Sequence, residues 1–203
     1  MIRDKELHHE SIMEAATAEF LEYGFTDASM RRIASAAGMS ASGLYKHFAG
    51  KEEMFSALTE PAYQGLMTLF RREADAQEQV IGTGDLSVWE SGRDARLAVE
   101  YIYDHLDAFR LLVCKSKGTK YETFLHDLAV LEEQTTLSFM ETLKNQGVKI
   151  NEFSERELHL LTTVNVNAVF QTVEHDFTRE EALHYADTLD RFFSKAWREF
   201  FGY

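Results

Sequence analysis

The chain has 203 residues, of which 45% are hydrophobic, and a net charge of −13. A chain of this length buries a core without help from disulfides, and its single cysteine, Cys114, excludes an intrachain disulfide. Its N-terminus is charged, unlike a secretory signal, and no apolar run reaches the ~18 residues of a membrane span. We therefore expect a cytoplasmic protein with no membrane partner.

Helices are predicted along the whole chain. There is one proline, Pro61, and no alternating apolar and polar run of strand length, whereas apolar residues recur at intervals of three and four. The first helix is predicted over 5–23, because Ile12 and Ala16 share a face and Gly24 follows at a usual stop position. The pattern as a whole predicts an all-α fold of about nine helices.

The segment from Ser29 to Lys51 has the spacing of a helix-turn-helix. A helix capped by Ser29, or by Thr26 with a shift of register, runs to Gly38, and glycine favours the left-handed conformation that ends a helix. Ser40 then caps a second helix, predicted over 41–48. Two short helices joined by a turn with a glycine form the motif that places its second helix in a DNA major groove.

The second helix of this motif divides into two faces. Leu44 and Phe48, one turn apart, are predicted to point inward. Among the outward residues, Tyr45 with its basic neighbours suits contacts to phosphates and base edges. Gly43 costs about 1 kcal/mol of helix propensity, so it is either simply tolerated or permits close approach to the duplex. The outward-facing residues are Ser42, Gly43, Tyr45, Lys46 and His47.

Positive charge is concentrated in the same segment. Between Gly24 and Lys51, four basic side chains stand against Asp27 alone, whereas residues 56–203 carry 15 basic and 25 acidic side chains. Because neutralisation of phosphates supplies much of the affinity for DNA, a basic island on an acidic chain is typical of a DNA-binding module. The helix N-terminus at Ser29 provides either a cap alone or a cap and a phosphate contact.

The rest of the chain is predicted as a helical bundle. A long helix is expected over 51–77, bent at Pro61, and a looser connection that contains glycines follows over 80–86. Ser154 and Glu157 have the spacing of a capping box. The remaining helices are predicted over 87–104, 107–115, 121–146, 154–175 and 178–201.

The last two predicted helices carry more apolar residues than one packing face requires. We therefore expect them to contact a second subunit as well as their own bundle. Pairing two such helices from each subunit into a four-helix bundle buries these surfaces, and the alternative is a large monomeric core. The predicted interface residues are Leu161, Ala168, Tyr185, Leu189, Phe192, Phe193, Ala196, Trp197 and Phe200.

Several polar side chains fall within apolar helical stretches, where a buried polar group costs free energy unless it is paired. Together with nearby aromatic residues, they predict a pocket for an unidentified small-molecule effector, although each residue taken singly is explained by a structural hydrogen bond or a solvent-facing position. The acidity of the chain slightly favours a neutral or cationic compound. The predicted pocket residues are Tyr101, His105, Phe109, Tyr121, Phe124, Phe139, Asn167, Phe170 and Gln171.

The sequence gives no sign of a catalytic or metal centre. None of the eight histidines forms a His-x-x-x-His pair, and Cys114 has no companion at ligand spacing. There is also no glycine-rich phosphate loop, nucleophile elbow or convergent Ser/His/Asp spacing. We therefore expect no metal, no cofactor and no enzymatic activity.

Many residues near the N-terminus match one family in register, namely Ile12, Ala15, Ala16, Gly24, Phe25, Ser29, Ile33, Ala34, Ala37, Gly38, Met39, Ser40, Leu44, Tyr45, His47, Phe48, Lys51 and Glu52. On these residues, the region from His9 to Phe55 resembles the N-terminal domain of the TetR family of bacterial transcriptional regulators. It departs from the family at His9, where relatives often have a basic residue, and at Ala41, where they often have lysine or proline. Both departures remove possible phosphate contacts.

We expect two domains, a helix-turn-helix DNA-binding domain over 1–50 and a helical ligand-binding and dimerisation domain over 51–203. The resemblance implies a homodimer that reads a palindromic operator in double-stranded DNA, usually as a repressor released by a small ligand. A helical small-molecule- or protein-binding dimer that has lost DNA binding is the alternative, and activation of transcription would use the same residues as repression. The expected DNA contacts are Ser29, Arg31, Arg32, Ser40, Ala41, Ser42, Gly43, Tyr45, Lys46, His47 and Lys51.

Overall fold

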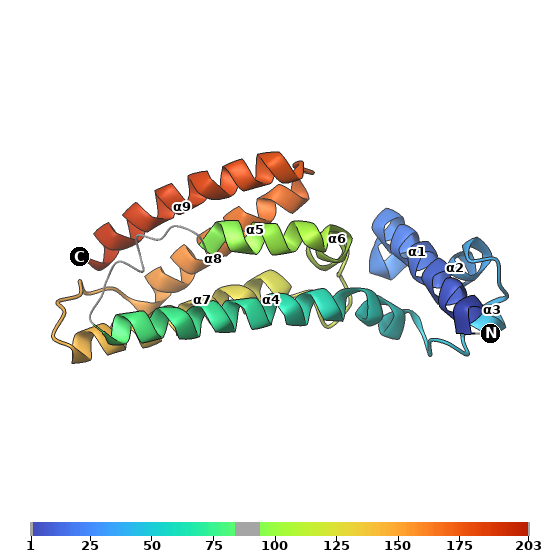
Figure 1. The fold of residues 1–203 in the computed structure, drawn as a ribbon, viewed down its shortest axis with the longest axis horizontal. Helices are drawn as coiled ribbons and strands as arrows, with labels where there is room; N and C mark the ends of the chain where they lie inside the picture. The colour runs from blue at the N-terminus through green and yellow to red at the C-terminus, as the bar shows by residue number, and fades with distance from the viewer. Residues whose placement is uncertain (1, 84–93, 203) are drawn as a thin grey trace. The chain divides into compact units, whose positions relative to one another are not determined.

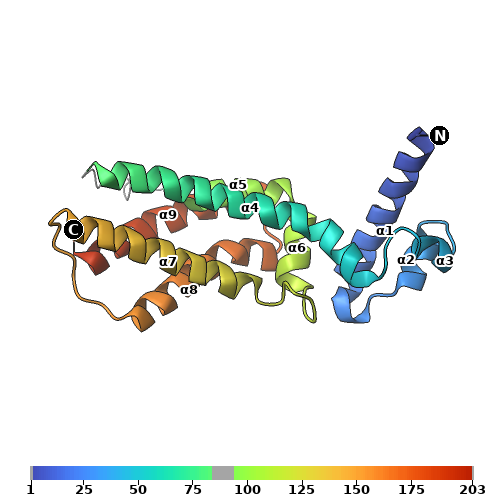
Figure 2. The same ribbon diagram turned by 90° about the horizontal axis from the view of Figure 1, so that it is seen from below.

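The computed structural model describes residues 2–83 and 94–202, and this part of the chain folds into nine helices without a strand (Figures 1 and 2). The all-α prediction is therefore confirmed. The helices are α1 (Ile2–Asp27), α2 (Met30–Ala36), α3 (Ala41–Leu44), α4 (Lys51–Gly82), α5 (Asp94–Asp104), α6 (Leu106–Cys114), α7 (Phe124–Asn145), α8 (Glu155–Glu174) and α9 (Arg179–Phe201).

Several predicted helix limits differ from the structure, among them the end of α4, which lies at Gly82 and not at 77, and the start of α7, which lies at Phe124 and not at 121. Helix α1 resumes for one short turn after Gly24, which is its only non-helical residue, and ends at Asp27. Helix α3 ends at Leu44, so its predicted extension to Phe48 is wrong. The predicted helix over 87–104 is present from Asp94, and its first residues lie outside the described part of the chain. Residues 84–86 of the predicted glycine-containing connection also lie outside it, but residues 80–82 form the end of α4, so a connection that begins at 80 is wrong.

The chain forms two compact units. The N-terminal unit comprises Met1–Gln64 and His105–Glu122, and the bundle unit comprises Gly65–Asp104 and Thr123–Tyr203. Helix α4 therefore contributes its first part to one unit and its second part to the other. Helix α6 belongs to the N-terminal unit, where it packs against α1.

An aromatic cluster forms the centre of the N-terminal unit. The Phe20 and Phe55 rings meet edge to face at 5.2 Å, and Phe25 contacts Phe55 at 5.5 Å between ring centroids. Tyr121 closes the cluster at 6.1 Å from Phe55. The Phe25 N–H also donates to the Lys115 carbonyl at 3.0 Å, so the end of α1 is hydrogen-bonded to the segment after α6. These contacts make residues 105–122 part of the scaffold that supports the helix-turn-helix.

In the bundle unit, α7 packs against α8, α8 against α9 and α5 against α9 (Figures 1 and 2). The predicted capping box is confirmed, because the Ser154 hydroxyl accepts from the Glu157 N–H while the Glu157 carboxylate accepts from the Ser154 N–H. Near the start of the unit, Gly65 is required by close packing, since a Cβ there would lie 1.8 Å from the Tyr101 hydroxyl. One core cluster contains Ile81, Phe139, Met140, Leu143, Leu158 and Phe201.

Candidate DNA-binding surface and ligand cavity

The turn between α2 and α3 has the geometry that the sequence predicts. Gly38 has φ of 68°, in the left-handed region that glycine adopts without strain. The Gly38 N–H donates to the Ser35 carbonyl at 3.1 Å, and the Met39 N–H donates to the Ala34 carbonyl at 2.9 Å. This pair of bonds is the Schellman ending of a helix. Helix α2 therefore stops at a fixed point and the chain turns into α3.

Ser40 fixes the start of α3, as predicted. Its hydroxyl accepts a hydrogen bond from the Gly43 N–H at 3.1 Å. A Cβ at position 43 would lie 3.2 Å from the Met39 Cε and 3.3 Å from the Ser40 Oγ, which is tighter than most real contacts. The turn itself therefore explains Gly43, and a close approach to DNA is not needed to account for it.

The two predicted faces of α3 and the following turn are present. Leu44 is fully buried and Phe48 nearly so, whereas the Tyr45 side chain is 52% exposed and Lys46 and His47 are exposed. After Leu44, the Lys46 and His47 N–H groups donate to carbonyls three residues back, at 3.1 and 2.9 Å. This tighter turn shortens the α-helix but keeps all three exposed side chains on the outside.

Ser29 stands at the N-cap of α2, but its hydroxyl makes no capping hydrogen bond, so the predicted side-chain cap is wrong. The buried Glu19 carboxylate on α1 instead accepts from the N–H of Ser29 itself at 2.7 Å. The same Oε1 atom accepts from Arg32 Nε at 2.8 Å, and the Arg32 guanidinium lies 4.3 Å from the centre of the Tyr23 ring. These bonds hold Arg32 against α1, and its guanidinium pKa is raised, chiefly by the hydrogen bond with Glu19.

Replacing Glu19 by alanine should therefore lower the thermal unfolding midpoint by about 3–6 °C. The substitution removes the acceptor for the part-buried N–H of Ser29 and for a half-exposed guanidinium, and the loss of such bonds to a charged acceptor costs about 1–3 kcal/mol. Thermal unfolding followed by circular dichroism measures this effect. Glu14→Ala, an exposed residue of the same helix, is the control and should change the midpoint by less than about 1 °C. Equal midpoints for the two variants would contradict this role for Glu19.

Lys51, one of the expected DNA contacts, makes its hydrogen bonds within the protein. Its ammonium donates to three backbone carbonyls, those of Phe25 at 2.7 Å, Thr26 at 2.6 Å and Ala28 at 3.3 Å. An ammonium has three donors, so these carbonyls take up its full hydrogen-bonding capacity. Lys51 therefore joins the start of α4 to the loop between α1 and α2.

A second polar cluster joins α4 to the segment after α6 within the N-terminal unit. The Glu60 carboxylate accepts from Lys120 Nζ at 2.8 Å, from the Tyr121 hydroxyl, and from Gln64 Nε2 at 2.8 Å. These hydrogen bonds, of which the one from Lys120 has the largest effect, lower the pKa of Glu60 from 4.5 to about 2. The same contact with Glu60 raises the pKa of Lys120.

The Glu60 cluster should make stability depend on pH in the acid range. The folded-state pKa lies below the unfolded value, so the carboxylate stabilises the fold above about pH 4.5 and loses this effect as pH falls toward 2. We expect the free energy of unfolding of Glu60→Gln to fall less steeply over this range than that of the parent, as measured by urea titration. Glu52→Gln, an exposed carboxylate of the same helix, is the control and should follow the parent. A parallel decline for all three proteins would contradict the prediction.

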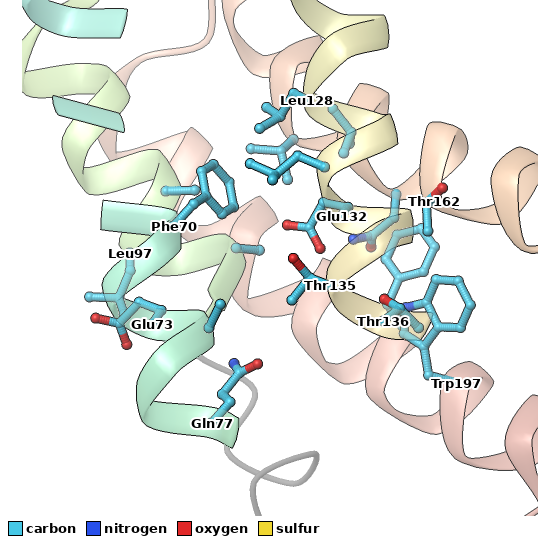
Figure 3. Close-up of a pocket in the computed structure, with 18 of the residues that line it drawn as sticks. Phe70, Glu73, Gln77, Leu97, Leu128, Glu132, Thr135, Thr136, Thr162 and Trp197 are labelled. Carbon is cyan, nitrogen blue, oxygen red and sulfur yellow. The ribbon is translucent and has the colours of Figure 1, made fainter. Parts of the chain in front are cut away.

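The bundle unit contains a cavity of about 190 Å³ (Figure 3). Its wall comes from α4, α5, α7, α8 and α9 and is largely apolar and aromatic. Glu132 and Thr135 project from α7 toward the side of the cavity that carries Phe70, and Trp197 contributes from α9 (Figure 3). An apolar cavity with a few polar groups is the usual form of a small-molecule site.

The structure places two of the nine predicted pocket residues, Phe139 and Phe170, in this wall. Four others belong to the bundle unit but do not line the cavity, and three belong to the N-terminal unit. The main sequence signal for more of the wall is the apolar stripe of α9. The width of this stripe alone predicts a dimer interface and does not indicate a cavity. The four are Tyr101, Phe124, Asn167 and Gln171, and the three are His105, Phe109 and Tyr121.

The predicted interface residues fall into two groups. Leu189, Phe193 and Trp197 face the cavity, and Phe200 packs against the core cluster around Phe201. Leu161, Phe192 and Ala196 are exposed, and Ala168 and Tyr185 are half-buried. Leu160 and Val164 of α8, which are not in the predicted set, are also exposed, at 60% and 56%.

In residues 2–83 and 94–202, no group of three or more histidine, cysteine, aspartate or glutamate side chains is placed to hold a metal ion. In the same ranges, no helix has the length and hydropathy required to cross a bilayer.

Comparisons with known proteins agree with this geometry. Residues 12–58 match the family model for bacterial regulatory proteins of the tetR family. Over 65 residues, the chain is 37% identical to the HTH-type transcriptional repressor KstR2 of Mycobacterium tuberculosis, a match that covers 32% of each protein. The aligned part of the chain thus spans about a third of the length of the curated relatives.

Solved structures share the fold over most of the chain. PfmR, a TetR family transcriptional regulator from Thermus thermophilus, has a TM-score of 0.58 at 21% identity, with 89% of this chain and 97% of that one covered. NalD, the secondary repressor of the MexAB-OprM multidrug efflux pump in Pseudomonas aeruginosa, has a TM-score of 0.53 at 18% identity, with 93% and 96% covered. At these identities the likeness shows the fold. Residues 12–58 are thus similar to the helix-turn-helix domain of the tetR family of bacterial regulatory proteins, and the described helices have the fold of TetR family structures.

Proposed function

We propose that this protein is a homodimeric transcriptional regulator that binds a palindromic operator and acts as a repressor released by a small ligand. The observation that carries the proposal is the exposed group Tyr45, Lys46 and His47 on a helix-turn-helix whose inner residues are buried. Arg31 on α2 adds an exposed cation to the same unit. The family repressors that share this domain support the same function.

The dimer is supported by apolar side chains that the bundle unit leaves in solvent. Leu160 and Val164 lie one turn apart on α8, and Phe192 on the adjacent α9 is 65% exposed. Exposed apolar surface on two packed helices favours a self-complementary contact with a second copy. A dimer would present its two copies of α3 to the two halves of a palindrome.

Release by a ligand is supported by the cavity in the bundle unit. A ligand that binds one conformation of the bundle better than another shifts the population toward it. Helix α4 is continuous between the two units, so a change at its bundle end reaches the N-terminal unit along one covalent element. In this proposal, the distance between the two copies of α3 in the ligand-bound dimer no longer matches one turn of DNA, about 34–36 Å.

The experiment that tests DNA binding is a selection of genomic fragments by the purified protein, followed by mobility-shift titration at two salt concentrations. We expect a palindromic site whose affinity falls as salt rises, because each phosphate contact releases counterions. Recovery of no palindrome at either salt concentration would favour the alternative, a helical dimer that binds a small molecule or protein and has lost DNA binding. The internal contacts of Arg32 and Lys51 are the observation that favours this alternative, since they take two cations away from DNA.

A further inference from the structure

The cavity of the bundle unit has a wall suited to an organic molecule. Phe70, Phe139, Phe193 and Trp197 line it, and the Trp197 ring stacks on Phe201 at 5.6 Å between centroids. A cavity of about 190 Å³ holds on the order of a dozen water molecules, which is the space of a small aromatic compound with a short chain. The apolar rings favour a ligand with an apolar body.

The charged groups of the wall are mostly negative. Three carboxylates, Glu73, Glu132 and Asp190, line the cavity together with one guanidinium, that of Arg71, which is exposed. Glu73 forms an ion pair with Arg72 at 3.1 Å, outside the wall. Glu132 and Asp190 are the other two acidic groups that a ligand in the cavity would meet.

The two carboxylates are held by different elements. Asp190 on α9 is 8% exposed, and its Oδ1 accepts from the Ala95 N–H at 3.1 Å, which fixes the side chain at the start of α5. Glu132 is half-buried on α7 and projects toward the side of the cavity with Phe70 (Figure 3). Negative charge in a partly enclosed, apolar site repels an anion and attracts a cation more strongly than it would in water.

We propose that the cavity binds an organic cation: an amine with an aromatic or aliphatic body, whose ammonium lies at Glu132 and Asp190 and whose body contacts the aromatic wall. The charge-assisted hydrogen bond to a carboxylate and the electron-rich faces of Trp197 and its neighbouring rings both favour a positive group. This inference rests on the proposed function, because it names the chemical class of the effector for the same regulator.

The test uses three compounds that differ only in their end group: 4-phenylbutylamine, 4-phenylbutanol and 4-phenylbutanoate. Calorimetric titration of the full-length protein in the absence of DNA should rank the amine tightest and the carboxylate weakest, with about tenfold between amine and alcohol. Equal affinities, tighter binding of the carboxylate, or no saturable binding of the amine would each overturn the proposal. DNA binding is measured in a separate experiment. A failure of the amine to bind would therefore overturn the proposed ligand class without deciding whether the protein binds DNA.

Variants locate the ammonium. Glu132→Gln should weaken the amine about tenfold and change the alcohol less than about twofold, because it removes charge and keeps shape. Glu141→Gln, an exposed residue of the same helix outside the wall, is the matched control and should change neither compound. Asp190→Asn keeps an acceptor for the Ala95 N–H and serves as the second variant. Unchanged amine affinity in both wall variants would overturn the assignment, whatever the ranking of the compounds.

Discussion

Replacing Tyr45 and Lys46 together by alanine is expected to lower the affinity of the protein for its selected operator by at least about 100-fold. Each side chain extends from the turn after α3 into solvent, Tyr45 with 52% of its surface exposed, while Leu44 and Phe48 keep that turn packed on the domain. A base or phosphate contact of this kind is worth about 1–3 kcal/mol, and the double variant removes two contacts from each subunit of a dimer.

The single variants separate the two roles. Lys46→Ala should weaken binding to all sequences alike and reduce the slope of log affinity against log salt by about one per subunit. Tyr45→Ala should keep the salt slope and change the preference among operator variants. Lys149→Ala, an exposed cation of the bundle unit, controls for the general loss of charge. A double variant that binds as tightly as the parent would remove this turn from the DNA interface.

The parts of the fold that depend on neighbours in sequence were predictable. Gly38 ends α2, Ser40 caps α3 and the Ser154–Glu157 pair starts α8, because each uses hydrogen bonds that span a few residues. Helical periodicity likewise predicts the inward positions of Leu44 and Phe48. These signals are local, so one sequence is enough to read them.

The parts that depend on distant residues were not predictable in the same way. Glu19 binds the Ser29 N–H at the start of α2, and Lys51 donates to loop carbonyls, because the fold brings these groups together across 10 and 26 positions. The apolar stripe of α9 contains residues for both the cavity and the outer surface. Its periodicity shows that two faces are apolar but does not show which face meets a partner, and only the folded bundle reveals that Phe193 and Trp197 line the cavity.

The variant Val164→Glu is expected to raise the dissociation constant of the proposed dimer by at least about 100-fold. Val164 is 56% exposed in the bundle unit, so the substitution costs the folded subunit little. In a two-fold interface, each substitution occurs twice and places like charges opposite one another, and the chain already carries a net charge of −13. Burial of these carboxylates without partners adds to the cost, which amounts to about 3 kcal/mol or more.

Sedimentation equilibrium measures this dissociation constant, and circular dichroism shows whether the variant keeps the thermal midpoint of the parent. Val80→Glu, at an exposed valine of α4, introduces the same charge on a helix outside the proposed interface and should leave the dimer intact. Because a palindromic site is read by two helices at once, Val164→Glu should also weaken operator binding while leaving the Tyr45 surface unchanged. Dimers of parental strength in a folded Val164→Glu protein would mean that the exposed faces of α8 and α9 are not where two subunits meet.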